Sequence, residues 1–172
     1  MVGECNAVFD QSSTYDKLIQ LLNKGHACYR LIDHPPAGPT ALASHLRGHP
    51  LEQAAKCIVL RIKVGKKISR YVLAVVSGEH RVDLNTLKGL FSGTYISFAT
   101  AETAERLAGS VSGTILPFSF SEELELIVDP NLLVHEEIFF NAARLDQSIA
   151  LNTNDYVTLS KPRIELIASK VF

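Results

Sequence analysis

Hydrophobic positions recur along the chain with two different periods. In residues 14–25 the apolar side chains fall at i, i+3, i+4 and i+7, which is the spacing of one helical face, and Gly25 ends the segment. Residues 56–64 instead have the character of a β-strand with alternating faces, and residues 70–78 are apolar almost throughout. The pattern predicts a helix, then two strands joined by a turn near residues 64–67, and it favours a central position for the second strand.

The remaining segments predict further helices and strands at short intervals. Strands are expected at residues 27–34 and 124–129, and helices at residues 38–48, 84–91, 101–109 and 153–160. Asp83 and Thr100 are placed to cap the helices that follow them. Helices and strands interspersed with hairpin-length connections favour a mixed sheet, largely antiparallel, with helices packed around it. We therefore expect a mixed α/β fold.

Lys56 occupies an unusual place in this pattern. Because successive strand side chains point to opposite faces, Lys56 shares a face with the aliphatic residues at positions 58, 60, 62 and 64. The other face begins with Cys57 and becomes polar toward Lys63. A lysine on an interior face costs free energy unless it is paired or has a function. Lys56 is therefore either a strand-end lysine whose ammonium reaches water or a functional cation.

The composition is that of an ordinary globular protein. The chain has 172 residues, 47% of them hydrophobic, and a formal net charge of −1, which suits one domain over residues 1–172. No apolar run approaches the ~20 residues of a membrane helix, and residues 1–17 lack the features of a signal peptide. Three widely separated cysteines without metal or redox spacing suggest reduced thiols in a cytoplasmic protein. Neither a membrane nor a metal or other cofactor is expected.

Charge is unevenly distributed along the chain. Residues 47–88 hold nine Lys or Arg against three Asp or Glu, whereas residues 89–172 hold five against eleven. The basic run at residues 61–70 is either a solvated hairpin, since surface hairpins are often rich in lysine, or a weak landing surface for a phosphate backbone. Charge alone does not decide between these interpretations.

Common catalytic motifs are missing from the sequence. It contains no G-x-S-x-G, H-E-x-x-H, P-loop or G-x-G-x-x-G pattern, and its six histidines have no grouping typical of a zinc site. His34, beside a Pro-Pro turn at a predicted strand end, is the one histidine placed for a pocket. Cys57 follows Lys56 but points to the opposite strand face, so a packed thiol is expected rather than a Cys–Lys pair.

Residues 112–118, with the sequence SGTILPF, form a second candidate site. A glycine and a proline four residues apart, followed by an aromatic residue, can make a rigid turn with exposed backbone N–H groups. Such groups can hold a carbonyl oxygen or an oxyanion. Because an ordinary turn between strands has the same pattern, neither this loop nor Lys56 is decisive alone.

Taken together, these segments resemble the YbaK / prolyl-tRNA-synthetase-associated editing-domain family. The similarity runs from about residue 34 to about residue 159 and is carried by QAAKCIVL, YVLAVVSGEHRVDL, SGTILPFSF, LIVDPNLL and FFNAARLDQSIALNTNDYVTL. The later motifs are most similar to members that are not fused to a synthetase. The resemblance implies a mixed α/β single domain with a mainly antiparallel six-stranded sheet and surrounding helices.

The resemblance also assigns candidate site residues. Lys56 matches the essential lysine of the family, and Gly113 matches the glycine of its G-x-x-x-P loop, so both are expected to be catalytic. The residues expected to bind substrate by the same match are His34, Pro117, Phe118, Ser119 and Asn141. No metal or cofactor is implied.

Two positions depart from the family pattern. Ser119 and Ala143 stand where the family commonly has glycine. A β-carbon at either position could narrow the pocket or change its backbone, and either effect would alter which amino acid is accepted.

The resemblance implies hydrolysis of the ester in mischarged aminoacyl-tRNA that carries a small amino acid. The implied partners are the acceptor end of the tRNA and, in addition, an aminoacyl-tRNA synthetase, with no membrane or DNA partner. A non-catalytic module that binds aminoacyl-tRNA or an amino acid is the main alternative, and a hydrolase of small esters or amides is a third. Release of the amino acid, rather than retention of the charged tRNA, distinguishes the first from the second.

Overall fold

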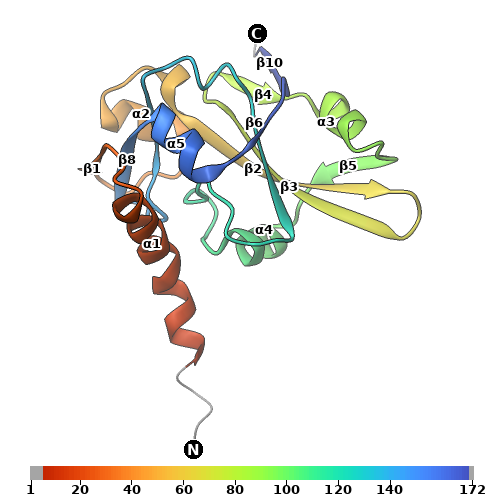
Figure 1. Ribbon diagram of the computed structural model, residues 1–172, viewed down its shortest axis with the longest axis horizontal. Coiled ribbons are helices and arrows are strands. Elements are labelled where there is room, and N and C mark those ends of the chain that lie inside the picture. Colours follow the sequence, from red (N-terminus) through yellow and green to blue (C-terminus); the bar gives the residue numbers. More distant parts are fainter. Residues whose placement is uncertain (1–5, 171–172) are drawn as a thin grey trace, which may run out of the picture.

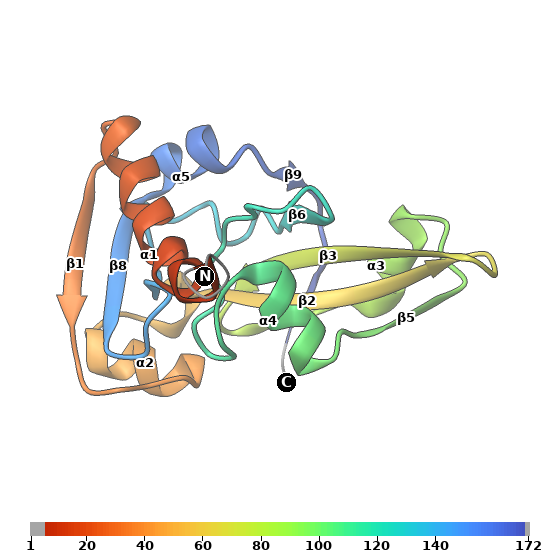
Figure 2. The same ribbon diagram turned by 90° about the horizontal axis from the view of Figure 1, so that it is seen from below.

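A computed structural model of the chain describes residues 6–170 and arranges them as three sheets surrounded by helices (Figures 1 and 2). The helices are α1 (Asn6–Lys24), α2 (Thr40–Arg47), the short 3-10 helix η1 (Leu51–Gln53), α3 (Leu84–Leu90), α4 (Ala101–Ala108) and α5 (Thr153–Ser160). The strands are β1 (Tyr29–Asp33), β2 (Ala55–Val64), β3 (Ile68–Ser77), β4 (His80–Val82), β5 (Tyr95–Phe98), β6 (Leu124–Val128), β7 (Glu137–Asn141), β8 (Gln147–Asn152), β9 (Arg163–Ile164) and β10 (Ala168–Lys170).

The mixed α/β fold is confirmed, but the predicted six-stranded sheet is wrong. The largest sheet has five strands in the order β5-β2-β3-β6-β9, and its β3–β6 and β6–β9 pairs are parallel. Strands β1, β8 and β7 pair antiparallel in a second sheet, and β4 pairs with β10 in a third. A single bridge between Ala54 and Phe139 joins the two larger sheets, so the ladder is interrupted just before β2 begins.

The predicted helices and strands named above are confirmed, and their local signals act as expected. The Asp83 carboxylate accepts a hydrogen bond from the Thr86 N–H (3.1 Å) at the start of α3. The Thr100 hydroxyl oxygen accepts from the Thr103 N–H (3.2 Å) at the start of α4. Strand β3 lies between β2 and β6, which makes it the central strand that its apolar sequence predicts.

The two faces of β2 belong to two different hydrophobic clusters. Cys57 and Val59 pack in a cluster that includes Leu107 of α4. Leu60 packs in a second cluster, which includes Leu87 of α3. Figure 2 shows the consequence, with α4 and α3 on opposite sides of the β2–β3 pair. Lys56, at the beginning of β2, therefore belongs to the side of the strand that faces α3, as the alternation of strand side chains predicts.

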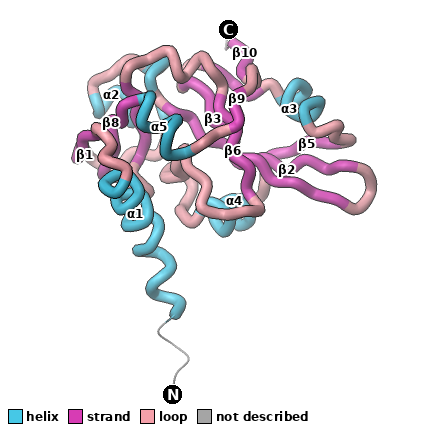
Figure 3. The backbone as a smooth tube through the Cα atoms, viewed as in Figure 1, coloured by secondary structure: helices cyan, strands magenta, loops and turns pink. Residues whose placement is uncertain are grey.

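The hairpin of β2 and β3 extends beyond the rest of the molecule, whereas the segment from α4 to β6 is a long loop (Figure 3). No helix within residues 6–170 has the length and apolarity needed to cross a membrane. Residues 1–5, which include Cys5 and part of the stretch expected to lack a signal peptide, lie outside the described residues.

Candidate active site

A small cavity lies where the two larger sheets meet, at the start of β2. Its volume is about 90 Å³, and it is lined by residues from α2 and the loop before it, from β2, from the loop after α4 and from β7. The lining residues are Gly38, Thr40, Ala43, Arg47, Ala55, Lys56, Cys57, Gly113, Ile115, Phe140 and Asn141. Two of them are cations and none is a carboxylate, so the cavity suits a substrate that carries or develops negative charge.

Lys56 is half-buried in the wall of this cavity. Burial lowers the pKa of its ammonium, and the nearby positive charge of Arg81 lowers it further. Among residues 6–170, no hydrogen bond or ion pair involves the Lys56 side chain. The ammonium is therefore available to a substrate rather than held in a structural ion pair.

Gly113 is required in its loop for two separate reasons. Its φ of 87° lies in the left-handed region, and a β-carbon added there would stand 3.0 Å from Cα of Gly38. The two glycines thus let the loop after α4 approach the loop before α2. Among the described residues, the N–H groups of Gly113 and Ile115 have no backbone or side-chain acceptor, which leaves two donors on lining residues.

Asn141, at the end of β7, ties the walls of the cavity together. Its Nδ2 donates to the carbonyl oxygens of Ala37 and Gly113, both at 2.8 Å, so the amide links the loops before α2 and after α4. Its Oδ1 faces the Ser148 hydroxyl at 3.0 Å and the Arg47 guanidinium at 3.4 Å. Because both polar atoms of the amide are engaged, the side chain is fixed and holds the Gly113 carbonyl oxygen in place.

Arg47 is a functional candidate that the sequence interpretation missed. It ends α2, and its guanidinium contacts only neutral groups, namely His49 Nε2 (2.9 Å), Ser148 Oγ (3.1 Å) and the oxygens of Asn141 and Ser44 (3.4 Å each). Burial lowers its pKa to about 10. No carboxylate in the described part of the chain forms an ion pair with it, so a positive charge remains beside Lys56.

His49 supports Arg47 from the side away from the cavity. Its ring stacks on Phe139 at 3.8 Å, and its Nδ1 lies 2.8 Å from the Pro50 carbonyl oxygen. Burial and the Arg47 charge hold its pKa near 4, below the ordinary 6.5, while the Pro50 contact opposes them. The neutral ring therefore donates from Nδ1 and accepts the Arg47 hydrogen bond at Nε2.

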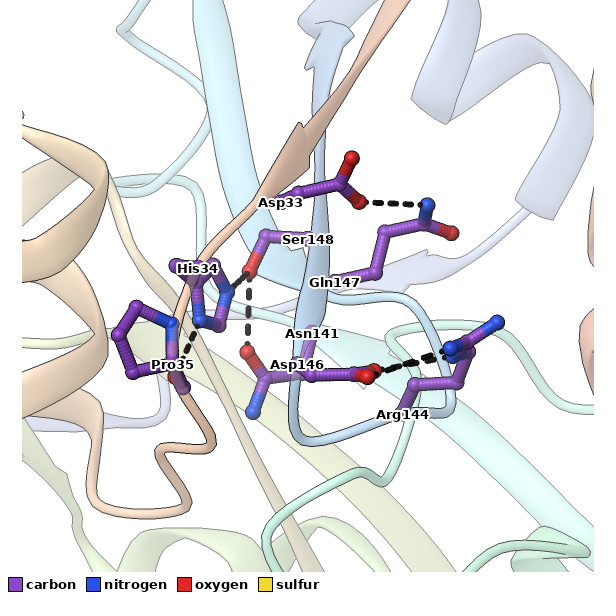
Figure 4. Close-up of polar contacts among 8 residues, drawn as sticks. All are labelled: Asp33, His34, Pro35, Asn141, Arg144, Asp146, Gln147 and Ser148. Atoms are coloured by element: carbon purple, nitrogen blue, oxygen red, sulfur yellow. Dashed lines mark hydrogen bonds and ion pairs between the residues drawn. The ribbon is translucent and has the colours of Figure 1, made fainter.

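His34 does not line the cavity, but it contacts Ser148, which in turn contacts the lining residue Asn141 (Figure 4). Its Nε2 lies 2.6 Å from Ser148 Oγ, and its Nδ1 lies 2.8 Å from the Pro35 carbonyl oxygen. The pair has the spacing of a Ser–His catalytic pair, but Ser148 is 0% exposed and does not line the cavity. The pair therefore positions Asn141 and does not supply a nucleophile.

Three residues expected to bind substrate lie elsewhere. Phe118 is 3% exposed and packs edge-on against Phe140 and Tyr156, and the carbonyl oxygen of Pro117 accepts from the Tyr156 hydroxyl at 2.7 Å. The Ser119 hydroxyl bonds to the Leu124 carbonyl oxygen at 2.6 Å. None of the three lines the cavity, and their contacts anchor the loop that carries Gly113, so a direct contact with substrate stays a prediction.

The two departures from the family pattern affect the backbone more than the cavity. Ser119 is turned toward β6, and Ala143 is not a lining residue. Ala143 has a φ of 59°, a left-handed conformation that glycine adopts with less strain. The expected narrowing of the pocket at either position is therefore not observed.

Cys57 is a packed thiol, as its strand phase predicts. Burial raises its pKa, which keeps the thiol protonated and unreactive although it touches the cavity. Within residues 6–170, no group of three or more His, Cys, Asp or Glu side chains could hold a metal ion.

Comparisons with known proteins identify the family of the chain. The model of the aminoacyl-tRNA editing domain matches residues 34–159. The multifunctional Ser/Thr-tRNA deacylase ProXp-y of Escherichia coli (strain K12) is 36% identical over 154 residues, which cover 89% of this chain and 92% of that protein. Proline--tRNA ligase of Geobacillus kaustophilus is 28% identical over 139 residues, which cover 74% of this chain and 23% of the ligase.

Solved structures show the same fold at low sequence identity. A candidate trans-editing enzyme for prolyl tRNA synthetase superposes with a TM-score of 0.73 at 21% identity, covering 91% of this chain and 97% of that one. A protein described as hypothetical superposes with a TM-score of 0.79 at 18% identity, covering 89% and 99%. Since the family match spans well over half of the residues, the chain belongs to the aminoacyl-tRNA editing domain family.

Proposed function

We propose that this chain is an aminoacyl-tRNA deacylase that acts in trans, hydrolysing the ester between a small amino acid and the terminal ribose of a mischarged tRNA. One observation carries the proposal: Lys56, Gly113 and Asn141, far apart in sequence, line one small cationic cavity with free N–H donors. The Escherichia coli relative, itself named a Ser/Thr-tRNA deacylase, is matched over 92% of its length, which supports action without a fused synthetase.

The cavity supplies electrostatic and positioning catalysis. Water attacks the ester carbonyl carbon, the carbonyl oxygen becomes an oxyanion, and the bond to the ribose oxygen then breaks. The N–H groups of Gly113 and Ile115 are placed to stabilise the oxyanion, a type of contact worth about 3 kcal/mol. Lys56 adds a positive point charge for the carbonyl or the terminal phosphate.

Proton transfer does not require a protein base in this scheme. A hydroxyl of the terminal ribose accepts a proton from the attacking water and passes its own proton to the departing ribose oxygen, so that the hydroxyl is regenerated. The products are a free amino acid and a tRNA with an intact 3′ end. Lys56 forms no covalent bond with the substrate, so trapping a substrate–lysine adduct would contradict this role.

Arg47 holds the reactive arrangement together. Its guanidinium contacts Asn141 Oδ1, and Asn141 in turn holds the Gly113 carbonyl, which orients the Gly113 peptide. Its charge adds to that of Lys56 in a site partly shielded from water, where charge interactions are stronger than in bulk solvent.

The size of the cavity limits the amino acid to a small one. A cavity of about 90 Å³ supports a small side chain, such as that of alanine, serine, threonine or cysteine. Thr40 contributes a hydroxyl to the lining, and the Escherichia coli relative is named for serine and threonine, so these two are the preferred substrates. A separate editing site is useful because one methylene gives a synthetase only about 1–3 kcal/mol of discrimination.

The alternatives from the sequence are less well supported. A non-catalytic binding module would not need two unpaired cations beside free backbone N–H groups, and a general ester hydrolase would not need a tRNA. A synthetase is a second partner in this proposal, because proline–tRNA ligases carry a related domain. The proposed compartment is the cytoplasm, where the charged tRNA is used.

The test is deacylation of tRNAs charged with Ala, Ser, Thr, Cys and Pro, comparing the wild type with Lys56→Ala. We expect release of serine or threonine and a loss of about 100-fold in kcat/KM in the variant. Lys17→Ala, an exposed lysine on α1, is the matched control and should keep the wild-type rate. Charged tRNA that stays bound without release would instead support the binding module.

A further inference from the structure

The β2–β3 hairpin carries a concentration of positive charge away from the cavity. Residues 53–78, which form both strands and their turn, contain six Lys or Arg and no Asp or Glu. Residues 84–101 supply the neighbouring strand β5 and also contain no Asp or Glu. Figure 1 shows the tip of this hairpin extending past α3 and β5.

The basic side chains of β2 lie on the same strand face as part of the cavity wall. Arg61 and Lys63 alternate in phase with Cys57, which lines the cavity. Lys63 is flanked across the ladders by Ser69 of β3 and by Tyr95 of β5, whose ring is 59% exposed. We name the basic hairpin surface by its residues: Arg61, Lys63, Lys66, Lys67, Ser69 and Tyr95.

These cations are not neutralised within the described part of the chain. Arg61 donates only to the neutral Ser69 hydroxyl, at 3.1 and 3.2 Å, and Lys63, Lys66 and Lys67 form no ion pair there. Glu125, the one acidic residue of the nearby strand β6, is engaged elsewhere, since it contacts Arg70 at 3.1 Å and Arg163 at 3.7 Å. The positive potential of the surface is therefore open to an external anion.

Protection of a sheet edge does not explain the charges on β2. Charged side chains blunt edge strands against pairing with other chains. However, β5 pairs with β2 from Leu60 to Lys63, so Arg61 and Lys63 do not lie on an edge. Only the start of β3 lacks an outer partner, since β6 covers Tyr71–Val75. A ligand is the better explanation of the charge on β2.

We propose that the basic hairpin surface binds the phosphate backbone of the acceptor stem of the same tRNA whose 3′ end occupies the cavity. The proposal rests on the proposed function. Lys63 lies six positions beyond Cys57 along β2, a span of about 20 Å. A tRNA placed with its charged end in the cavity continues as unpaired nucleotides and then as the acceptor duplex, and charge complementarity places that duplex along the hairpin.

A contact of this kind affects binding and leaves the chemistry unchanged. Lysine–phosphate contacts carry no sequence information, so the surface serves several tRNAs equally. Each lost contact should reduce the salt slope of binding by about 1 and weaken binding uniformly across tRNA sequences. Loss of such a contact should therefore raise KM and Kd and leave kcat unchanged.

The test variant is Lys63→Gln/Lys66→Gln/Lys67→Gln, and the control is Lys17→Gln/Lys24→Gln/Lys161→Gln, which removes the same charge from exposed lysines elsewhere. Two substrates are compared, full-length seryl-tRNA and a seryl ester of the terminal adenosine alone. For seryl-tRNA we expect the test variant to raise KM about tenfold and to reduce the salt slope by about 3. For the short ester we expect both triple variants to match the wild type.

Two outcomes would overturn the inference: an equal loss with the short ester, or an equal loss with the control variant. Binding of uncharged tRNA gives a second readout that does not depend on hydrolysis. If the wild type releases no amino acid but the test variant still weakens tRNA binding about tenfold, the deacylase function fails and the surface stands. If tRNA binds all three proteins equally, the surface proposal is wrong whatever the activity.

Discussion

Asp129 and Arg47 are both withdrawn from solvent and lack an opposite charge within the described residues, yet their surroundings differ. Asp129 is 0% exposed, and its carboxylate accepts backbone hydrogen bonds from Asn131, Ile167 and Ala168, each at 2.8 Å. Arg47 contacts only neutral side chains, two of them at 3.4 Å, and it faces the cavity. One charge is fully satisfied by fixed donors, and the other retains unused binding capacity.

The difference separates a structural charge from a functional one. The bonds to Asp129 fasten the segment before β10 to the end of β6 and so complete the pairing of β10 with β4. The hydrogen bonds of Arg47 also join α2 to the second sheet, but they leave its charge without an opposite charge, and an uncompensated cation costs free energy in a partly buried site. Such a cost is expected where the charge acts on a ligand. Removing the charge of Asp129 should therefore reduce stability and preserve activity, whereas removing the charge of Arg47 should reduce activity and preserve stability.

The largest effect is expected from Asp129→Ala. It leaves three backbone N–H groups without their acceptor, and the free energy of unfolding should fall by about 4 kcal/mol. Chemical denaturation measures this change, and Asp129→Asn, which keeps one carbonyl oxygen, should give an intermediate value. Below the unfolding transition, kcat/KM for seryl-tRNA should change less than about threefold. A stable variant that has lost its activity would reverse the assignment.

Arg47→Met should show the opposite signature. The unbranched apolar side chain removes the charge and replaces the apolar stem of arginine, so the free energy of unfolding should change by less than about 1 kcal/mol. The kcat/KM for seryl-tRNA should fall about 100-fold, because Asn141 loses a partner and the cavity loses a cation.

Arg47→Lys is the matched variant, since it keeps the charge without the planar fork. We expect it to recover part of the activity. Loss of stability equal to that of Asp129→Ala would show that Arg47 is structural after all.

The support of Arg47 by His49 gives a smaller, pH-dependent effect. The folded pKa of His49 is about 4, below 6.5, so the unfolded chain binds the proton more tightly. The contribution of the neutral His49 ring to the free energy of unfolding is therefore complete above pH 6.5 and is lost as the pH falls toward 4. Because the ring is about half exposed, solvent screening reduces the loss to about 1 kcal/mol.

His49→Gln isolates this effect from the carboxylates that titrate over the same range. Glutamine keeps an acceptor for Arg47 but cannot be protonated. The difference in unfolding free energy between wild type and variant should therefore narrow or change sign on acidification, by about 1 kcal/mol between neutral pH and pH 4. A pH-independent difference would contradict the assigned pKa.

The features of the site that the sequence predicts are those that depend on local sequence. Strand alternation places Lys56 correctly, and the G-x-x-x-P pattern identifies Gly113, because both depend on neighbouring residues. Arg47 ends α2, where a cation is ordinarily favourable to the helix dipole, so nothing in its own segment marks it as functional. Its partners Asn141 and Ser148 come from the second sheet, more than 90 residues away.

Long-range pairing also explains why the observed sheet differs from the predicted one and why some predicted site residues lie outside the cavity. Whether β6 joins β3 in parallel, and whether β7 and β8 extend the larger sheet, depends on the path of the whole chain. Pro117 and Phe118 follow Gly113 closely, yet Tyr156 draws them into the core and away from the cavity. Family patterns identify such residues without stating whether they contact substrate or hold those that do.

Ala143→Gly tests whether backbone strain near Asn141 belongs to the functional arrangement, and its expected effect is the smallest. Glycine relieves the φ of 59° but loses a partly buried methyl group, for a net gain of about 0.5 kcal/mol in unfolding free energy. Ala142→Gly is the control: Ala142 is 0% exposed without positive φ, so the same change should destabilise by about 1 kcal/mol. Because hydrogen bonds fix Asn141, Ala143→Gly should leave kcat/KM unchanged, and a marked loss would show that the strain positions Asn141 for Arg47.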